Sequence, residues 1–350
     1  MKLLIITQKV DINDDLLGFF HAWIAEFAGH CEKVVVIALG IGEYDLPANV
    51  KVLSLGKERG APKLEYLINF YRYIWKLRDD YDTVFVHMNK EYVVMGGLFW
   101  KLTGKKISLW YQHKKTSLGL KLAEILSNNI LTASGESFKL KSEKVRYVGH
   151  GVDMKKFFPP AGRQAGGNFK IIYLGRISEI KNQKLLIEAF NILINNKNIN
   201  GLAAELIGAP ATSADKIYLN GLKSLVEKYG LSKNIIFTGS VPHNKIPGYL
   251  SSADLSVNLC PTGGLDKAVL ESLALGVPAI ALNKIFSGIF KDYEKYFILE
   301  KAEAGELAEK ISAYKNLNGQ EKIRLELLNR VKADYGLGKL IKKIIDILKK

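Results

Sequence analysis

The residues from Thr262 to Pro278, TGGLDKAVLESLALGVP, combine a glycine-rich loop with a carboxylate on the helix that follows it. Gly263 and Gly264 allow the backbone to approach a ligand closely. The N-terminus of the helix offers N–H groups and the positive end of its dipole to an anion. Glu271 lies in the second turn, where it could accept hydrogen bonds from a sugar hydroxyl. The stretch therefore fits a pocket for a phosphate and a ribose, and an ordinary strand–helix unit with a glycine-rich turn explains it equally well.

A second group of chemically capable residues follows a predicted strand at Ile171–Leu174. Gly175 and Arg176 come directly after this strand, and Lys181 follows five residues later. Arginine supplies a planar fork of donors and lysine a compact charge, a combination that suits phosphate oxygens. Solvated loop cations are the alternative interpretation.

Length and composition bound the class of protein. The 350 residues suffice for two domains, and 48% apolar with 24% charged residues indicates a globular chain. No apolar run reaches the ~20 residues that cross a bilayer. The apolar run before Gln8 is too short for a signal peptide and predicts a first strand instead. Cys31 and Cys260 are far apart without metal-ligand spacing, so we expect a reduced, cytoplasmic compartment and no metal site.

The net charge of +15 calls for a polyanionic partner, such as nucleic acid, anionic lipid or a phosphorylated substrate. Zinc-finger spacing and an aromatic-basic RNA signature are absent from the sequence, so no nucleic acid is expected. A lysine-rich genome bias is a strong alternative explanation. Several lysines gather in the second half of the N-terminal region, at 105, 106, 114, 115, 139 and 141. Residues Lys339–Lys350 predict an amphipathic basic helix that docks its apolar side on the protein.

Short apolar runs alternate with helical patterns along most of the chain, which predicts parallel sheets covered on both faces. The N-terminal half has predicted strands at Leu3–Thr7, Val34–Ala38, Val50–Leu55, Thr83–His87, Ile107–Tyr111, Ile130–Ala133 and Val145–Val148. Its predicted helices are Phe19–Ala28, Lys63–Arg78 and Tyr92–Leu102.

The segment Pro159–Gly167 contains two prolines and three glycines, so we place a linker there. Beyond it, strands are predicted at Lys170–Tyr173, Ala204–Ile207, Ile235–Thr238, Leu255–Leu259, Pro278–Leu282 and Tyr296–Leu299. Helices are predicted at Leu185–Asn195, Asp215–Tyr229, Asn244–Ser251, Asp266–Leu275 and Gly305–Leu317. The expectation is a doubly wound domain at residues 1–160, with the final helix, about 336–350, packed back on it, and a second at 161–335. Ligands are expected in a cleft, at the carboxyl ends of the strands.

Taken together, these segments resemble the retaining GT-B glycosyltransferases of family 4, also called glycosyl transferases group 1. The resemblance is carried by the Gly175–Lys181 segment, the turn Phe237-Thr-Gly239, Glu271 with its helix, and Val148-Gly-His-Gly-Val-Asp153 with Phe157. It covers most of the C-terminal half and the N-terminal half only in outline. It implies two Rossmann-like domains facing across a cleft and sugar transfer from a UDP- or GDP-sugar with retention of configuration.

The resemblance also implies roles for individual residues. Arg176 and Lys181 would stabilise the charge that develops on the leaving diphosphate, without a metal ion or other cofactor. Glu271 would bind the ribose hydroxyls. The remaining donor-binding candidates are Gly175, Gly239, Ser240, Gly263, Gly264, Leu265, Asp266 and Lys267.

One position departs from the family pattern. The family usually has a second glutamate eight positions before Glu271, near the donor sugar, and this chain has Gly263 there. Asp266 could partly substitute for it, or backbone N–H groups of Gly264, Leu265 and Asp266 could hold the sugar. Lys267 is either a phosphate contact or a solvated lysine of the first helical turn.

The N-terminal half supplies candidates for the acceptor side. His113 follows the strand that ends near Trp110, and the family often presents a histidine there to the transferred sugar. His87, at the end of its own strand, and Gly18, after the first strand, are further candidates. The acceptor implied is a glycan or a lipid-linked intermediate. The positive charge of this half predicts peripheral association with an anionic membrane at its cytoplasmic face.

Three other functions compete with this one. A degenerate, non-catalytic protein that binds nucleotide sugars or polyanions remains open because of Gly263. A nucleotide-sugar epimerase of related fold would need paired carboxylates, and no such arrangement is visible in the sequence. A dehydrogenase is disfavoured because no G-x-G-x-x-G motif follows the first strand.

Overall fold

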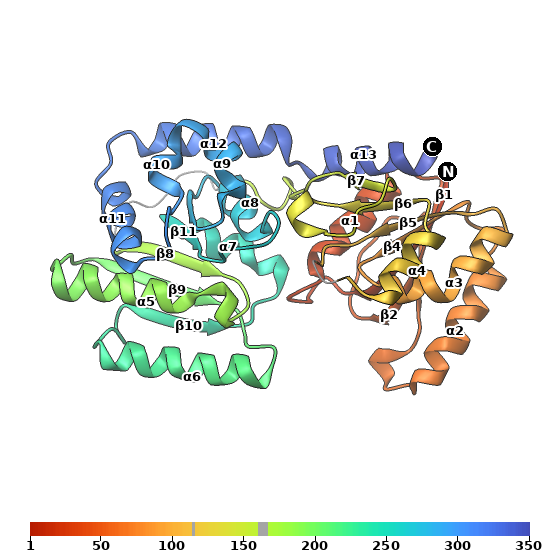
Figure 1. Cartoon of the computed structure of the whole chain (residues 1–350), viewed down its shortest axis with the longest axis horizontal. Helices are drawn as coiled ribbons and strands as arrows, with labels where there is room; N and C mark the ends of the chain where they lie inside the picture. The colour runs from red at the N-terminus through yellow and green to blue at the C-terminus, as the bar shows by residue number, and fades with distance from the viewer. Residues whose placement is uncertain (114–115, 160–166) are drawn as a thin grey trace. The chain divides into compact units, whose positions relative to one another are not determined.

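The computed structural model describes residues 1–113, 116–159 and 167–350, and the chain divides into two compact units (Figure 1). Unit 1 contains Met1–Gly151, Pro242–Asn244 and Leu337–Lys350, and unit 2 contains Val152–Val241 and Lys245–Gly336. Most of the expected linker, residues 160–166, lies outside the described residues, and so do the lysines at 114 and 115.

Unit 1 is built on a seven-stranded sheet in the order β3-β2-β1-β4-β5-β6-β7, and every neighbouring pair is parallel. Its strands are β1 Lys2–Val10, β2 Lys33–Ile41, β3 Val50–Ser54, β4 Thr83–His87, β5 Lys106–Trp110, β6 Asn129–Thr132 and β7 Val145–Tyr147. The central strands are continuous apolar runs because both faces of the sheet are covered.

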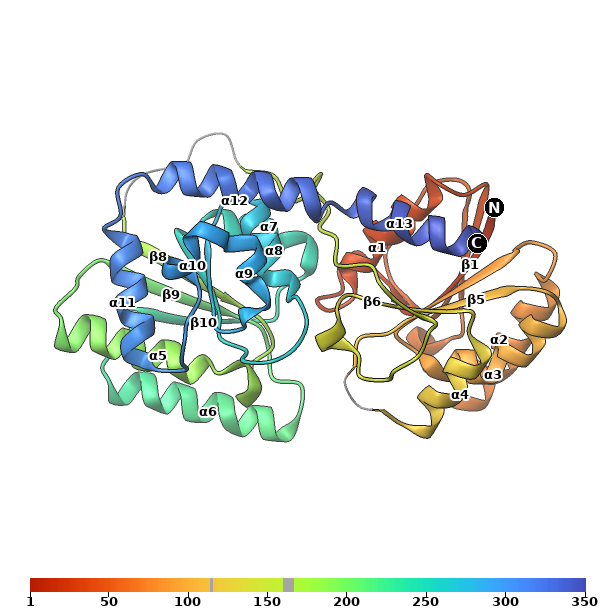
Figure 2. The same ribbon diagram turned by 45° about the horizontal axis from the view of Figure 1, so that its top comes forward.

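Alternate side chains of β1 enter two different cores, as the two-residue period of a strand requires. Leu3 and Ile5 belong to the core beneath α1 (Gly18–Ala28) and the C-terminal helix α13 (Leu337–Lys349). Leu4 and Ile6 belong to the core on the other face. That face is covered by α2 (Lys63–Lys76), α3 (Lys90–Leu102) and α4 (Leu118–Leu126), which Figure 2 shows side by side.

Unit 2 has a five-stranded parallel sheet in the order β10-β9-β8-β11-β12. The strands are β8 Phe169–Leu174, β9 Leu202–Ile207, β10 Ile235–Gly239, β11 Leu255–Asn258 and β12 Ala279–Ala281. Helices around it are α5 Gln183–Asn191, α6 Ser213–Lys228, α7 Ile246–Ser251, α8 Lys267–Ala274, α9 Ser287–Phe290, α10 Glu294–Phe297, α11 Ala304–Lys315 and α12 Gln320–Asp334. One continuous apolar core joins them to the sheet.

The prediction of an α/β chain with two parallel, doubly wound sheets is confirmed, with local corrections. The predicted strand Tyr296–Leu299 is wrong: Glu294–Phe297 form the short helix α10, and only Ile298 makes an isolated parallel bridge to Ala281. The helix predicted to Asn195 continues past Asn191 as a π-helix over Ile192–Asn196. Helices α4, α9 and α12 were not predicted. Within the described residues, no helix has both the length and the apolar content needed to span a bilayer.

Candidate functional site

Backbone hydrogen bonds tie together the loops at the carboxyl ends of β8, β9 and β10. The N–H of Gly175, after β8, donates to the carbonyl of Ile207 at the end of β9 (2.9 Å). The N–H of Gly208 donates in turn to the carbonyl of Gly239 at the end of β10 (2.8 Å). These contacts fix the loop that carries Arg176 at the edge of the sheet where parallel α/β sheets bind ligands.

Gly208 makes this close approach possible. A β-carbon at this position would lie 2.0 Å from the carbonyl oxygen of Gly175, and the residue has a φ of +146°. Only glycine satisfies both conditions. Gly208 was not among the predicted site residues, although a glycine directly after an apolar strand is a readable signal.

Arg176 is exposed, and its backbone is held from within unit 2. The side-chain amide of Gln183, which is fully buried, donates to the Arg176 carbonyl oxygen (2.9 Å). The loop is thereby anchored while the guanidinium stays accessible to a ligand.

Lys181 is joined to the start of α8 through Asp266. The Lys181 Nζ lies 2.5 Å from Asp266 Oδ2, and Asn258 Nδ2 donates to the same oxygen (2.9 Å). The other oxygen, Oδ1, accepts from the backbone N–H of Ala268 (3.2 Å), so that Asp266 is also the N-cap of α8. One carboxylate thus links the ends of β8 and β11 to the helix.

Both members of this pair remain charged around neutral pH. Burial acts to lower the pKa of Lys181, but the attraction of Asp266 outweighs it and the pKa lies above its ordinary value. Burial acts to raise the pKa of Asp266, but the charge and hydrogen bond of Lys181 outweigh it and the pKa lies below its ordinary value. Arg176 also acts on Lys181, lowering its pKa, so the two cations sense each other.

The buried Tyr173 fixes the backbone around Lys181. Its hydroxyl donates to the Lys181 carbonyl oxygen and accepts from the backbone N–H of Leu259 (3.2 Å). Burial raises the pKa of Tyr173 well above its ordinary value, so the hydroxyl keeps its proton. The sequence identifies Tyr173 only as part of a predicted strand, and nothing in its spacing indicates the second role.

The glycine-rich loop before α8 offers backbone donors. Gly263 has a φ of +124°, and its carbonyl oxygen accepts from Asn283 Nδ2 (3.1 Å). No described residue accepts a hydrogen bond from the backbone N–H groups of Gly264, Leu265 and Asp266. These groups stand at the positive end of the α8 dipole, an arrangement suited to an anion.

Glu271 and Lys267 lie one turn apart on α8, and both are withdrawn from solvent. Glu271 is 6% exposed, and the Nζ atom of Lys267 is buried. Burial lowers the pKa of Lys267 well below its ordinary value, against the opposing attraction of Glu271 and Asp266. Lys267 is therefore not the solvated lysine of the alternative interpretation, and Glu271 is not a surface side chain.

Gly239 is the last residue of β10 and has a φ of +82°, and Ser240 follows it at the same edge of the sheet. The structure therefore brings the predicted donor-side residues to one edge of unit 2, from the loops after β8, β10 and β11. Among the described residues, no group of three or more His, Cys, Asp or Glu side chains could hold a metal ion.

The acceptor-side candidates belong to unit 1. His113 is exposed after β5, with its ring 5.3 Å from that of Tyr111. His87 is 3% exposed, stacks on Phe20 at 3.9 Å between ring centroids, and has Nδ1 3.4 Å from the Thr7 hydroxyl. Gly18 is the first residue of α1. Of the two histidines, only His113 is open to a ligand.

Comparison with solved structures identifies the fold. The Anabaena protein HepE, in structures with UDP and with UDP and glucose, covers the whole of this chain with TM-scores of 0.75 and 0.77 at 16% and 15% identity. A sucrose-phosphate synthase from Thermosynechococcus elongatus gives a TM-score of 0.75 at 15% identity, over all of this chain and 98% of its own. The fold is therefore GT-B, as predicted.

Curated relatives match parts of the chain. The alpha-monoglucosyldiacylglycerol synthase of Streptococcus pneumoniae is 28% identical over 52% of this chain and 42% of its own length. The lipopolysaccharide core biosynthesis mannosyltransferase LpsB of Rhizobium meliloti is 26% identical over 44% of this chain and 45% of its own. The matches thus span less than half of the length of these relatives.

The family model described as glycosyl transferases group 1 matches residues 154–330, just over half of the chain. This range contains Arg176, Lys181, Gly208, Asp266 and Glu271. By this match the chain belongs to the glycosyl transferases group 1 family.

Proposed function

We propose that the protein transfers a sugar from a UDP- or GDP-sugar to a glycan or lipid-linked acceptor, with retention of anomeric configuration and without a metal ion. The observation that carries this proposal is the convergence of Arg176, Lys181 and the start of α8 at one edge of the second sheet. Two cations and a row of backbone N–H groups are the elements that stabilise a leaving diphosphate. The buried Glu271 on the same helix would accept hydrogen bonds from the ribose.

Names and ligands of related proteins support a nucleotide-sugar donor. The HepE structures contain UDP and UDP-glucose. Curated relatives include a GDP-mannose-dependent mannosyltransferase that acts on phosphatidylinositol monomannoside, 25% identical over 40% of this chain. Such relatives motivate both the choice between UDP and GDP and the lipid-linked acceptor. In this proposal unit 1 supplies the acceptor side, and the exposed His113 is its candidate residue.

Thermal unfolding tests donor binding first. UDP or GDP should raise the melting temperature in the presence of EDTA, because the cations and amide groups replace a metal. The same proteins are then incubated with UDP-glucose or GDP-mannose, and release of the nucleoside diphosphate is measured. Arg176→Ala and Lys181→Ala should each lose most of this turnover, whereas Lys233→Ala, an exposed lysine at the opposite edge of the same sheet, should not.

The outcomes separate the parts of the proposal. A melting temperature unmoved by every nucleoside diphosphate would overturn the donor site. Unchanged turnover in both variants would overturn the diphosphate role of the cations. Once an acceptor is found, the anomeric proton coupling in the NMR spectrum of the product decides between retention and inversion.

A second candidate function rests on Gly263. Because the usual carboxylate near the donor sugar is missing, the chain could be a non-catalytic protein that binds nucleotide sugars. It would then show the thermal shift with UDP or GDP but release no diphosphate from any sugar nucleotide, with or without acceptor extracts.

A further inference from the structure

Lys267 is a buried cation at the donor side of unit 2 whose role the proposed function leaves open. It is the first residue of α8, and its Nζ atom is buried, whereas Arg176 is exposed and the Lys181 side chain is 21% exposed. A diphosphate that reaches this edge of the sheet therefore meets the other two cations before it meets the Lys267 amine. The buried lysine needs an explanation of its own.

Local stability does not account for a lysine at this position. A cation in the first turn of a helix opposes the helix dipole. A lysine four residues before a glutamate is also the less favourable order of such a pair. Burial adds the cost of removing the amine from water, and it lowers the pKa of Lys267 well below its ordinary value. A residue that violates several local preferences at once is expected where function requires it.

Glu271 is the group that offsets this cost. Side chains four residues apart on a helix lie on one face, so Lys267 and Glu271 are neighbours on α8, and Glu271 is buried as well. Of the two carboxylates that oppose the effect of burial on the Lys267 pKa, Glu271 acts more strongly than Asp266. Asp266 is already engaged by Lys181 and by the backbone N–H of Ala268. The carboxylate with which Lys267 chiefly interacts is therefore Glu271.

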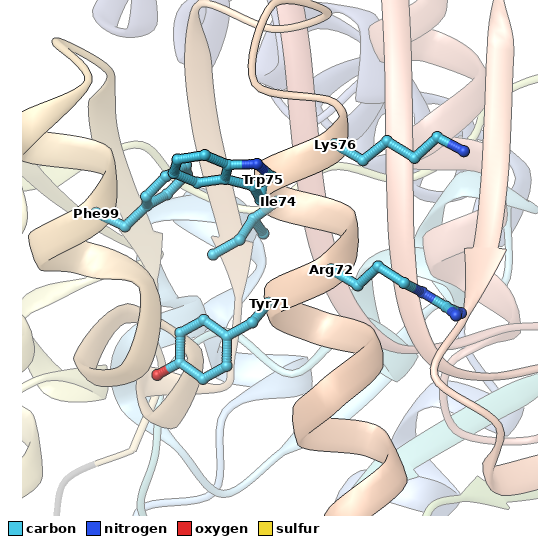
Figure 3. Close-up of a pocket in the computed structure, with 6 residues that line it drawn as sticks. All are labelled: Tyr71, Arg72, Ile74, Trp75, Lys76 and Phe99. Atoms are coloured by element: carbon cyan, nitrogen blue, oxygen red, sulfur yellow. The ribbon is translucent and has the colours of Figure 1, made fainter.

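A cavity of about 410 Å³ in unit 1 provides no alternative site for the nucleotide (Figure 3). It lies between α2 and α3, and the rings of Tyr71, Trp75 and Phe99 line it. Arg72 and Lys76 also line it, but Figure 3 shows their charged ends on the other side of α2. A hollow with mainly aromatic walls offers a nucleotide neither a cation nor a carboxylate, so ribose recognition is expected at the edge of unit 2.

The amino group of Lys267 can hold a carboxylate in either protonation state. An ammonium group has three N–H donors, and the neutral amine that burial favours still carries N–H donors. A glutamate side chain that is free to rotate loses conformational entropy when a ligand fixes it, whereas one that is already held does not. A held Glu271 would thus present its oxygens to a ribose at a lower entropic cost.

We propose that Lys267 is a positioning residue, which holds the Glu271 carboxylate in the orientation needed to accept hydrogen bonds from the ribose hydroxyls of the donor. This inference rests on the proposed function, in which Glu271 binds the ribose. It assigns Lys267 to the ribose half of the nucleotide, and Arg176 and Lys181 to the diphosphate half. Removing the amine should therefore weaken recognition of the ribose and spare recognition of the diphosphate.

Binding of UDP and of 2′,3′-dideoxy-UDP by the full chain, measured by isothermal titration calorimetry in EDTA, tests this division. GDP and dideoxy-GDP replace them if GDP binds more tightly. The unchanged protein should prefer UDP by roughly tenfold to a hundredfold, the effect of a hydrogen bond to a charged group. Lys267→Met should lose most of this preference, while its affinity for dideoxy-UDP changes little. Lys267→Gln keeps an N–H donor and should retain part of the preference.

Combined variants test whether the lysine acts through Glu271. Glu271→Met should lose the same preference, and the double variant Lys267→Met/Glu271→Met should lose no more than Glu271→Met does. Urea unfolding without nucleotide adds a second measurement. Each single variant leaves one buried charged group without its neighbour, so the double variant should lose less unfolding free energy than the sum of the two single losses.

The matched control is a lysine–glutamate pair of the same spacing and order on α6, Lys223 and Glu227, both of which are exposed. Lys223→Met and Glu227→Met should leave both nucleotide affinities unchanged, and their effects on the unfolding free energy should add. Circular dichroism shows whether each variant is folded. If Lys267→Met is not folded, Lys267→Gln carries the nucleotide comparison.

The results separate the roles that Lys267 could have. Equal weakening of UDP and dideoxy-UDP binding by Lys267→Met would make the lysine a diphosphate contact and overturn the inference. A preference for UDP that survives in Lys267→Met, or additive unfolding losses for Lys267 and Glu271, would overturn it as well. In each of these cases the unchanged protein still binds UDP or GDP. Failure of both nucleotides to bind the unchanged protein would instead overturn the proposed function, and this inference with it.

Discussion

Replacing Asp266 by asparagine removes one charge from the donor side and changes little else. Asparagine has nearly the same shape and caps helices as well as aspartate, so the hydrogen bond to Ala268 that begins α8 is kept. What is lost is the negative partner of Lys181, 2.5 Å away. Lys181 then remains charged in a site where only 21% of its side chain is exposed.

The magnitude follows from the burial of this pair. Breaking a fully buried ion pair from one side costs about 3–5 kcal/mol. With a fifth to a quarter of each side chain exposed, roughly 2–3 kcal/mol is the better expectation after discounting for solvent. At about 2–4 °C per kcal/mol for a unit of this size, the melting temperature should fall by roughly 4–12 °C.

Nucleoside diphosphate should behave in the opposite way. Without the carboxylate, an anion near Lys181 gains about 2 kcal/mol at an effective dielectric constant of about 20 and a distance of roughly 8 Å. We therefore expect UDP or GDP to raise the melting temperature of Asp266→Asn by more than that of the unchanged protein. Differential scanning fluorimetry measures both effects.

The control is Asp292→Asn, also in unit 2, whose side chain is 88% exposed and should be dispensable. An unchanged melting temperature in Asp266→Asn would refute the stabilising role of the pair. A different result would identify Asp266 as a sugar ligand. In that case UDP would still raise the melting temperature of the variant in full, but UDP-glucose would no longer raise it further than UDP does, as it would in the unchanged protein.

Two further predictions concern the same edge of unit 2. Gly208→Ala should lower the free energy of unfolding by about 3 kcal/mol or more and abolish the UDP shift, because its β-carbon would collide with the fixed carbonyl of Gly175. The control is Gly221→Ala, in the open interior of α6, which should raise the free energy of unfolding by about 0.5–1 kcal/mol in the same thermal melts. Because the folded pKa of Asp266 lies below its ordinary value of 3.8, the stability from its pair with Lys181 is present above about pH 3.8 and is lost as the pH falls through the folded value. The difference in melting temperature between Asp266→Asn and the unchanged protein should therefore shrink as the pH is lowered below about 4, and a constant difference would contradict the assignment.

The fold was predictable because its strands are buried on both faces. Continuous apolar runs such as Val34–Ala38 and Val84–Val86 carry the signal of a parallel sheet directly. The error at Tyr296–Leu299 has the same origin: an apolar run of four residues is equally compatible with a short buried helix. Helix α12 was not predicted because its sequence is polar around most of its circumference and lacks a broad apolar face. Its buried residues are Ile323, Leu327 and Val331.

The site was predictable only where its residues follow strands. Arg176, Lys181 and Glu271 stand at positions that strand order assigns to one edge of the sheet. The links between them do not follow from order, since the Lys181–Asp266 pair joins residues 85 positions apart and depends on side-chain direction. Tyr173 was assigned to the core by its strand position, and only the structure shows its hydroxyl between Lys181 and Leu259.

Gly263 sets the path of the backbone in this loop, and it also leaves the position without a carboxylate. At a φ of +124°, a residue with a β-carbon is strained whatever the space around it, so restoring glutamate there would require the loop to change its path. The present path is held by Asn283, which donates to the Gly263 carbonyl oxygen, and by Asp266 three residues later. Because Asp266 is committed to Lys181 and to the start of α8, the groups that this loop leaves for a sugar in the proposed donor site are the N–H groups of Gly264 and Leu265. A sugar recognised mainly by backbone donors is selected by its acceptor oxygens and its shape.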